Sequence, residues 1–163
     1  RAARYLADLP EPPPPGRVTF FEAANTAVPL SDACADVVLE GWSFGHSVVE
    51  AGDGWETAAS ALLDESFRLL RPGGTIVVIE TLGTSRVRPE PPHPLLETWY
   101  AWLEGTRGFS SAWIRTDYRF SSRDEADRLA GLFFGERFSY EPGPDGSVVL
   151  PECTGTWWRR KDP

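Results

Sequence analysis

The segment LLDESFRLLRPGGTIVVIET, residues 62–81, decides the fold of this chain. Its first half places leucine and phenylalanine at helical spacing, with charged residues between them. Pro72 ends that pattern because it has no N–H to donate, and Gly73 and Gly74 allow the backbone to reverse. The run TIVVIE, residues 75–80, has five β-branched residues in succession before its final glutamate, which is typical of a strand covered on both faces. A helix that leads into a buried strand through a tight turn predicts an α/β fold.

More strands and helices are predicted before this segment. VTFFEA (18–23) and DVVLE (36–40) both have the composition of short buried strands. Residues 41–54 read as a long loop, and residues 55–70 as the helix that enters the opening segment. Alternation of strands and helices favours a parallel sheet.

The second half of the chain continues the alternation. Residues 95–104 form an amphipathic aromatic helix, and AWIRTDYRF (112–120) alternates well enough to be one strand. Ser122 and Glu125 have the spacing of a capping box and open a helix that ends at Phe134. A last strand is expected within residues 147–159.

With 163 residues, the chain has the length of one domain. Residues 1–9 have helical spacing, and PEPPPPG (10–16) is a stiff connector, for which a proline-motif ligand is the less favoured alternative. We divide the domain into residues 1–17, a motif-bearing part at 18–81 and a C-terminal substrate-side half at 82–163. The chain begins with Arg1 and contains no methionine, from which we expect a piece of a longer protein.

Composition excludes several classes of protein. Apolar residues make up 41% and charged residues 25%, as in soluble globular proteins, and no apolar run is long enough to span a membrane. The net charge of −8 argues against nucleic acid as a partner. Cys34 and Cys153 are far apart, without metal-site spacing and without a secretory signal before them. They predict reduced thiols, a cytoplasmic location and no metal centre.

Two stretches resemble motifs of the class I S-adenosylmethionine-dependent methyltransferases. AVPLSDACADVVLEGW (27–42) is similar to one of them, and DESFRLLRPGGTIVVIE (64–80) is similar to the motif that follows it in that family. The match runs from about residue 18 to residue 80, in the family's order and spacing. The later segments IRTDYRF and PECTGTWW look like a poorly characterised subgroup of methyltransferase-like proteins.

The resemblance implies a Rossmann-like sheet of strand order 3-2-1-4-5-7-6, with helices on both faces and strand 7 antiparallel. On that template, strands 3, 4, 5, 6 and 7 correspond to VTFFEA, DVVLE, TIVVIE, AWIRTDYRF and residues 153–159. Strands 1 and 2 are missing, together with the glycine-rich loop and the acidic residue that hold the cofactor in the family. We therefore expect strand 3 to dock on strand 4 or to pair with another chain. The exposed edge of DVVLE would otherwise promote self-association.

The implied cofactor is S-adenosylmethionine. On the family pattern, Ala24 and Asn25 would contact its adenine ring, although the family usually has Asp where this chain has Ala24. Glu40, Gly41 and Trp42 follow a strand at the edge where open α/β sheets bind ligands, and they complete the predicted cofactor site. An ordinary strand-to-loop junction remains open for Ala24 and Asn25, and a core or lid position for Trp42.

Candidate catalytic and substrate-binding residues lie further along the chain. His46 has a side chain suited to a general base, with a solvated loop histidine as the alternative. The predicted substrate-binding residues are Thr81, Thr84, Arg115, Asp117 and Tyr118. For the last three, a structural ion pair and hydrogen bond is the favoured alternative.

The aromatic side chains of Trp99, Tyr100 and Trp102 recur at helical spacing, which most simply indicates a packing face. As a cap over a substrate site, they would favour an apolar or cationic acceptor.

The resemblance implies methyl transfer from S-adenosylmethionine to a small molecule by the intact protein, with this chain binding the cofactor weakly or not at all. The alternative is a non-catalytic methyltransferase-like binding or partner subunit. A nicotinamide-dependent enzyme is disfavoured because its fingerprint is absent.

Overall fold

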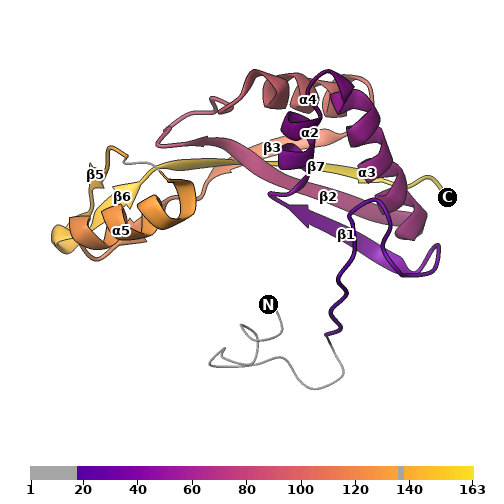
Figure 1. Cartoon of the computed structure of the whole chain (residues 1–163), viewed down its shortest axis with the longest axis horizontal. Coiled ribbons are helices and arrows are strands. Elements are labelled where there is room, and N and C mark those ends of the chain that lie inside the picture. Colours follow the sequence, from indigo (N-terminus) through magenta and orange to yellow (C-terminus); the bar gives the residue numbers. More distant parts are fainter. Residues whose placement is uncertain (1–17, 136–137) are drawn as a thin grey trace.

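A computed structural model describes residues 18–135 and 138–163, and these form a mixed α/β fold (Figure 1). The expected α/β class is confirmed. The predicted helix at residues 1–9 and the connector at residues 10–16 lie outside the described residues.

The main sheet has four strands in the order β1-β2-β7-β3. They are β1 (Ala35–Gly41), β2 (Leu70–Thr84), β7 (Glu152–Arg160) and β3 (Ser110–Arg115). Strands β1 and β2 are parallel, and β7 is antiparallel to both of its neighbours, β2 and β3. The carboxyl ends of β1, β2 and β3 therefore meet at one edge of the sheet.

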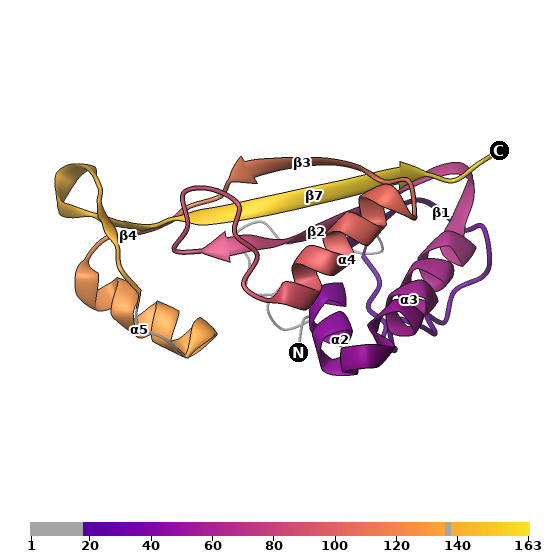
Figure 2. The same cartoon turned by 90° about the horizontal axis from the view of Figure 1, so that it is seen from above.

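Helices α2 (Phe44–Ala51), α3 (Trp55–Leu69) and α4 (Pro94–Gly105) pack on one face of this sheet (Figure 2). A short 3-10 turn, Gly52–Gly54, joins α2 to α3. The core lies between helices and sheet, because apolar side chains on the inner face of β2 meet those of the helices. Its largest fully buried members include Trp99, Leu63, Leu70, Ile76, Leu103, Val48 and Val78.

The opposite face of the sheet is bare in the described part of the chain, so the expectation of helices on both faces is wrong for these residues. Val37 and Leu39 on β1 are 60% and 66% exposed, and Ile114 on β3 is 58% exposed. In the same sheet, Ile76 and Val78 on the covered face are fully buried. The strands have the apolar composition of a doubly covered sheet.

The predicted turn at Gly73 and Gly74 lies inside β2, where the pairing with β1 shifts in register, and this segment is held by the end of the chain. Gly73 adopts a φ of 77°, in the left-handed region that favours glycine. The backbone of Lys161 accepts from Gly73 N and donates to Gly74 O. Its ammonium donates to the carbonyls of Phe67 and Leu70, at 2.6 and 2.7 Å, where α3 ends. A cation there satisfies carbonyls that have no partner within the helix.

The predicted strand at residues 18–23 is absent. Val18, Phe20 and Phe21 are all exposed, and the segment docks neither on β1 nor on any other described strand. Its composition suits a strand, but an extended segment becomes one only where a neighbour pairs its backbone groups. A two-residue bridge between Ala24 and Ala27 is all that forms nearby.

The predicted loop at residues 41–54 is also wrong, because it folds into α2 and the 3-10 turn. Phe44, Gly45 and Val48 form the buried side of α2, which gives this short helix its packing. Ser43 precedes it but makes no side-chain cap.

The strand predicted at residues 112–120 divides into β3 and β4 (Tyr118–Phe120), which belong to different sheets. The last strand likewise divides at Pro151, into β6 (Val148–Leu150) and β7. A smaller sheet has the order β4-β6-β5, with β5 at Glu141–Pro142. A 3-10 turn, Pro144–Gly146, joins β5 to β6. Helix α5 (Arg123–Phe134) packs against β4 and β6 of this sheet. Helix α5 begins at the predicted cap, where Ser122 Oγ accepts from Glu125 N.

Replacement of the lysine that holds the turn should destabilise the fold. We predict that Lys161→Met lowers the free energy of unfolding by about 1–3 kcal/mol, because two carbonyls lose a charged donor. Urea denaturation measures the change. Arg128→Met, at an exposed position on α5, is the control and should shift it by less than about 0.5 kcal/mol. Equal effects of the two substitutions would contradict this role of Lys161.

We propose that the bare face and edge of β1 cause self-association. Leu39→Thr removes apolar surface from β1, and the β-branched threonine still suits a strand. The substitution should therefore lower both self-association and the binding of a hydrophobic dye. Sedimentation velocity measures the self-association. Leu132→Gln, at a residue of α5 that is 74% exposed, removes similar surface away from the sheet and should have no such effect.

Candidate functional site

Two glutamates lie on neighbouring parallel strands towards the carboxyl edge of the sheet. Glu40 lies near the end of β1 and Glu80 near the end of β2, and they are only 5% and 3% exposed. The register pairs Glu40 with Val78, so both carboxylates extend from the face that the helices cover. Ionisable groups buried at this edge are functional-site candidates.

The carboxylate of Glu40 caps helix α2. Its Oε1 accepts from the backbone N–H groups of Ser43 and Phe44, at 2.6 and 3.0 Å, and from Ser43 Oγ at 3.0 Å. The first N–H groups of a helix have no partner within it, and the positive end of its dipole favours an anion. Its other oxygen, Oε2, is buried without a hydrogen-bond partner among the described residues.

Glu80 approaches the same helix one residue further on. Its Oε1 accepts from Gly45 N at 2.8 Å. A Cβ at residue 45 would lie 3.0 Å from Glu80 Oε2 and 3.1 Å from Leu96 Cδ2, so glycine lets β2, α2 and α4 meet at this point.

Burial and mutual repulsion shift the titration of this pair. Burial raises the pKa of Glu40. Burial, followed by the negative charge of Glu40, raises the pKa of Glu80 to about 8, against the lowering effect of Gly45 N–H. At neutral pH the edge therefore holds a proton on Glu80 that an exposed carboxyl would release.

Tyr100 on α4 lies close to this pair. Its hydroxyl donates to the carbonyl of Thr81 at 2.9 Å, and burial, together with the charges of Glu80 and Glu40, raises its pKa. The Tyr100 hydroxyl therefore stays protonated and acts as a hydrogen-bond donor to β2.

A cavity of about 210 Å³ opens beside β1 at this edge. Its lining residues are Asn25, Val28, Val38, Leu39, Glu40, Gly41, Ser43, Phe44, Glu65, Ser66 and Leu69. Asn25 Nδ2 donates to Ser43 Oγ at 3.3 Å, which links the segment before β1 to the beginning of α2. A Cβ at Gly41 would meet nothing within 4 Å, so a ligand could reach the backbone there.

Arg68 on α3 fixes the segment that forms one wall of this cavity. Its guanidinium donates to Glu65 at 2.7 and 2.8 Å, to Asp32 and to the carbonyl of Val28, while Glu65 also accepts from Val28 N. The hydrogen bond from Arg68 is the main cause that lowers the pKa of Glu65 to about 2. Glu65 in this wall is therefore negatively charged throughout the physiological pH range.

The predicted cofactor residues separate into two groups. Asn25, Glu40 and Gly41 line the cavity, whereas Ala24 and Trp42 do not. Trp42 is 51% exposed and adopts a φ of 54°, held by a hydrogen bond from its N–H to Ile79 O. A left-handed conformation costs a non-glycine residue about 1–2 kcal/mol and marks this turn as a constrained one.

His46 lies on the exposed side of α2, not on a loop, and lines neither of the two described cavities. It is near enough to Glu40 for their charges to interact. A catalytic role for His46 stays a prediction.

Three of the predicted substrate-binding residues join one polar network with Glu152. Thr81 Oγ1 donates to Glu152 Oε1 at 2.7 Å, and Glu152 N donates to Asp117 Oδ1 at 3.0 Å. Asp117 in turn pairs with the Arg115 guanidinium at 2.6 and 2.7 Å. These bonds tie β2, β7 and the end of β3 together, which is the structural role that the sequence favoured for Arg115 and Asp117.

Thr84 and Tyr118 lie outside these bonds. Thr84 ends β2 and pairs with Glu152 in the ladder. Tyr118 packs on Phe120 and Phe134 of the smaller sheet and α5. Binding of substrate by any of the five predicted residues stays a prediction.

The sequence reasoning missed Glu80 and Glu65 as site residues. One signal for Glu80 was present, because DVVLE and TIVVIE both end in glutamate, and neighbouring parallel strands bring their ends together. Glu65 looked like one of several charges on a helix, and only the fold shows that it faces the cavity.

No group of three or more His, Cys, Asp or Glu side chains in residues 18–135 and 138–163 is placed to hold a metal ion. Within the same ranges, the helices are all too short or too polar to cross a bilayer.

The contact at Gly45 predicts a local loss of stability. Gly45→Ala should lower the free energy of unfolding by about 1–3 kcal/mol, because the new methyl group meets Glu80 and Leu96. Thermal denaturation measures the change. Gly54→Ala, at a position with nothing within 4 Å of the new Cβ and a φ of −87°, is the matched control. Similar losses in both variants would refute the proposed contact.

The pKa of Glu80 predicts a pH dependence. Between about pH 5 and 8 the folded protein keeps a proton that the unfolded chain releases, so stability should fall as pH rises, by at most about 1.4 kcal/mol per pH unit. Glu80→Gln removes this titration and should show a shallower slope, measured by urea denaturation at several pH values. Parallel slopes for the two proteins would rule out a raised pKa at Glu80.

Comparison with known proteins gives only distant matches. No protein-family model and no curated protein matches this sequence. Among solved structures, a candidate methyltransferase from Bacillus halodurans C-125 is 11% identical, with 90% of this chain and 79% of that chain covered and a TM-score of 0.48. The 4+2 cyclase SpnF is 14% identical over 90% of this chain and 56% of its own, with a TM-score of 0.38.

A candidate DNA modification methylase from Thermus thermophilus, complexed with S-adenosyl-L-methionine, is 16% identical, with 83% of this chain and 51% of that chain covered and a TM-score of 0.32. The match thus spans about half the length of that protein and of SpnF. The neighbours include methyltransferases, but at these identities and scores the likeness carries no argument about this chain.

Proposed function

We propose that this chain is part of an S-adenosylmethionine-dependent methyltransferase that acts on a small molecule. The observation that carries the proposal is the strand order β1-β2-β7-β3 with β7 antiparallel. This order is compatible with the order 4-5-7-6 that the motif resemblance implies, and β1 and β2 lie within the two motif stretches. Strand order follows from long-range pairing, so it supports the motifs independently of their sequence.

The cavity beside β1 suits part of this cofactor. The sulfonium and ammonium groups of S-adenosylmethionine are cationic, and the unpartnered Oε2 of buried Glu40 offers them a negative partner. Gly41 would allow close approach of the ligand to the backbone. Asn25 would supply an amide at the same wall.

The described residues do not fit the whole cofactor. A volume of about 210 Å³ is below the roughly 300–1,000 Å³ of ordinary ligand pockets. No glycine-rich loop follows a strand at this edge in the described ranges. The chain therefore supplies one wall of the proposed site, and we derive no reaction step through the cofactor.

The same edge carries two side chains that could hydrogen-bond a methyl acceptor. Glu80 holds a proton near neutral pH, and the Thr81 hydroxyl is fixed by Glu152. A site of this kind would orient an acceptor and exclude water, which are the main needs of a direct displacement. His46 stays a proposed general base, and it could act only on an acceptor bound against the exposed side of α2.

The alternative function is a non-catalytic binding or partner subunit with the same fold. Ala24, at the position where the family usually has Asp, favours it, as does the small cavity.

Calorimetry with S-adenosylhomocysteine distinguishes the two functions. For this chain we predict weak binding, with a dissociation constant in the high micromolar to millimolar range. Glu40→Gln should weaken it further by removing the charge at the cavity, while Glu56→Gln on the outer side of α3 serves as a control that should leave it unchanged.

Absence of any heat at millimolar ligand would favour the non-catalytic alternative. A dissociation constant of a few micromolar or less would contradict the account of a single wall. Equal loss in both glutamate variants would exclude a specific role for Glu40.

A further inference from the structure

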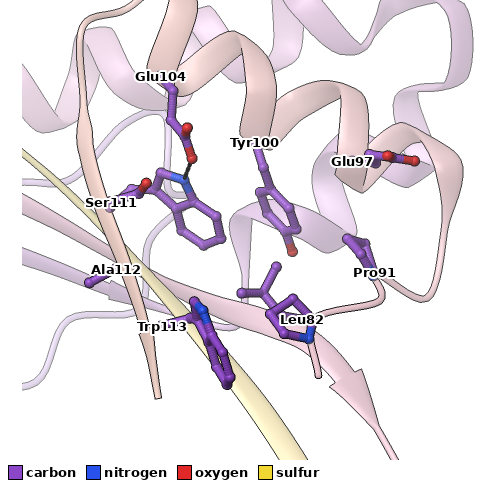
Figure 3. A pocket seen from close by; sticks show the side chains of 10 residues that line it. Leu82, Pro91, Glu97, Tyr100, Glu104, Ser111, Ala112 and Trp113 are labelled. Carbon is purple, nitrogen blue, oxygen red and sulfur yellow. Dashed lines mark hydrogen bonds between the residues drawn. The ribbon is translucent and has the colours of Figure 1, made fainter. Parts of the chain in front are cut away.

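A second cavity lies on the inner face of the sheet, between α4 and strands β3 and β7 (Figure 3). Its volume is about 310 Å³, larger than that beside β1. Ser111 and Trp113 of β3 form one side of it, and Leu82, near the carboxyl end of β2, also lines it. It shares no lining residue with the cavity beside β1 and is therefore a second, separate cavity.

Three aromatic side chains, Tyr100, Trp113 and Trp157, line this cavity. Trp157 of β7 and Tyr100 of α4 stack with their centroids 4.3 Å apart, and Trp113 of β3 joins them. Gly155 makes room for this arrangement, because a Cβ there would overlap the ring of Trp157. Trp157 and Tyr100 are 2% and 4% exposed, so the rings at the base are fixed by the core, whereas Trp113 is 48% exposed.

Two carboxylates accompany the rings (Figure 3). Glu104 Oε1 accepts from Trp157 Nε1 at 2.9 Å, and this bond leaves the negative charge of Glu104 at the cavity. Glu97, on α4 two turns before Glu104, lines the cavity as an exposed residue. None of the lining residues within the described ranges is basic.

We propose that this cavity binds a small organic cation, namely an alkyl- or arylammonium group with an apolar body. Aromatic faces attract a cation through the ring quadrupole, and nearby carboxylates add to that attraction. The apolar part of such a ligand would lie against the rings and Leu82. The net charge of −8 favours the approach of a cation to the chain.

The sequence placed Tyr100 within an aromatic face of the 95–104 helix, but the cavity uses only this one of the three aromatic residues. Trp99 and Trp102 belong to the core, and Trp102 packs edge-on against Trp55 at 5.7 Å. Of that aromatic face, Tyr100 is therefore the residue that lines this cavity.

A pair of isosteric probes tests the role of charge. Choline and 3,3-dimethylbutan-1-ol have the same shape, but only choline is cationic. In an NMR titration that follows the indole N–H of Trp157, assigned with Trp157→Phe, choline should bind about 3- to 30-fold more tightly than the alcohol. Equal affinities, or shifts at Gly45 N–H in place of Trp157, would overturn the proposal.

Variants test the residues with phenyltrimethylammonium as the probe. Trp113→Ala and Glu104→Gln should each weaken its binding at least about 3-fold, and the amide oxygen introduced by the second substitution can still accept from Trp157. Trp158→Ala is the matched control, because Trp158 lies on the opposite face of β7. Unchanged affinity in Trp113→Ala, with a native near-ultraviolet spectrum, would refute the site, as would equal losses in all three variants.

Discussion

The burial of two carboxylates at the beginning of helix α2 is the constraint on which this edge of the structure depends. Burying a carboxylate costs several kcal/mol unless hydrogen bonds and a favourable field offset the loss of water. The first N–H groups of α2 provide both for Glu40, and Gly45 N–H provides one for Glu80. The offset is incomplete, and the raised pKa of Glu80 is its consequence.

These bonds position several elements at once. They fix α2 against the ends of β1 and β2, and α2 with Gly45 sets how closely α4 can approach. At the opposite end of the sheet, Lys161 holds the Gly73–Gly74 segment of β2 and the end of α3. At one end the charged Lys161 has hydrogen-bond partners, and at the other the Oε2 atom of Glu40 has none among the described residues. We therefore place the proposed cofactor site at the end that holds Glu40.

Local pattern predicted the elements whose packing is local. TIVVIE, DVVLE and the helix before the PGG turn appear where their apolar spacing indicated. Helix α2 was missed because its cap comes from Glu40 on a strand, not from Ser43 beside it. Residues 18–23 have strand composition but no strand to pair with, and AWIRTDYRF divides where Arg115 pairs with Asp117. The cofactor wall was predicted in part, since Asn25, Glu40 and Gly41 do line a cavity. Glu80 and Glu65 needed the fold itself, because their neighbours come from distant parts of the chain.

The most direct test of the proposed methyltransferase site is to map where the cofactor product binds. Backbone NMR spectra of the chain, recorded with increasing S-adenosylhomocysteine, would show which amides respond. The account predicts shifts of Gly41, Ser43 and Gly45 at the edge formed by β1 and α2, with the Trp157 indole unaffected. Absence of shifts at millimolar ligand, or shifts confined to residues far from this edge, would contradict it.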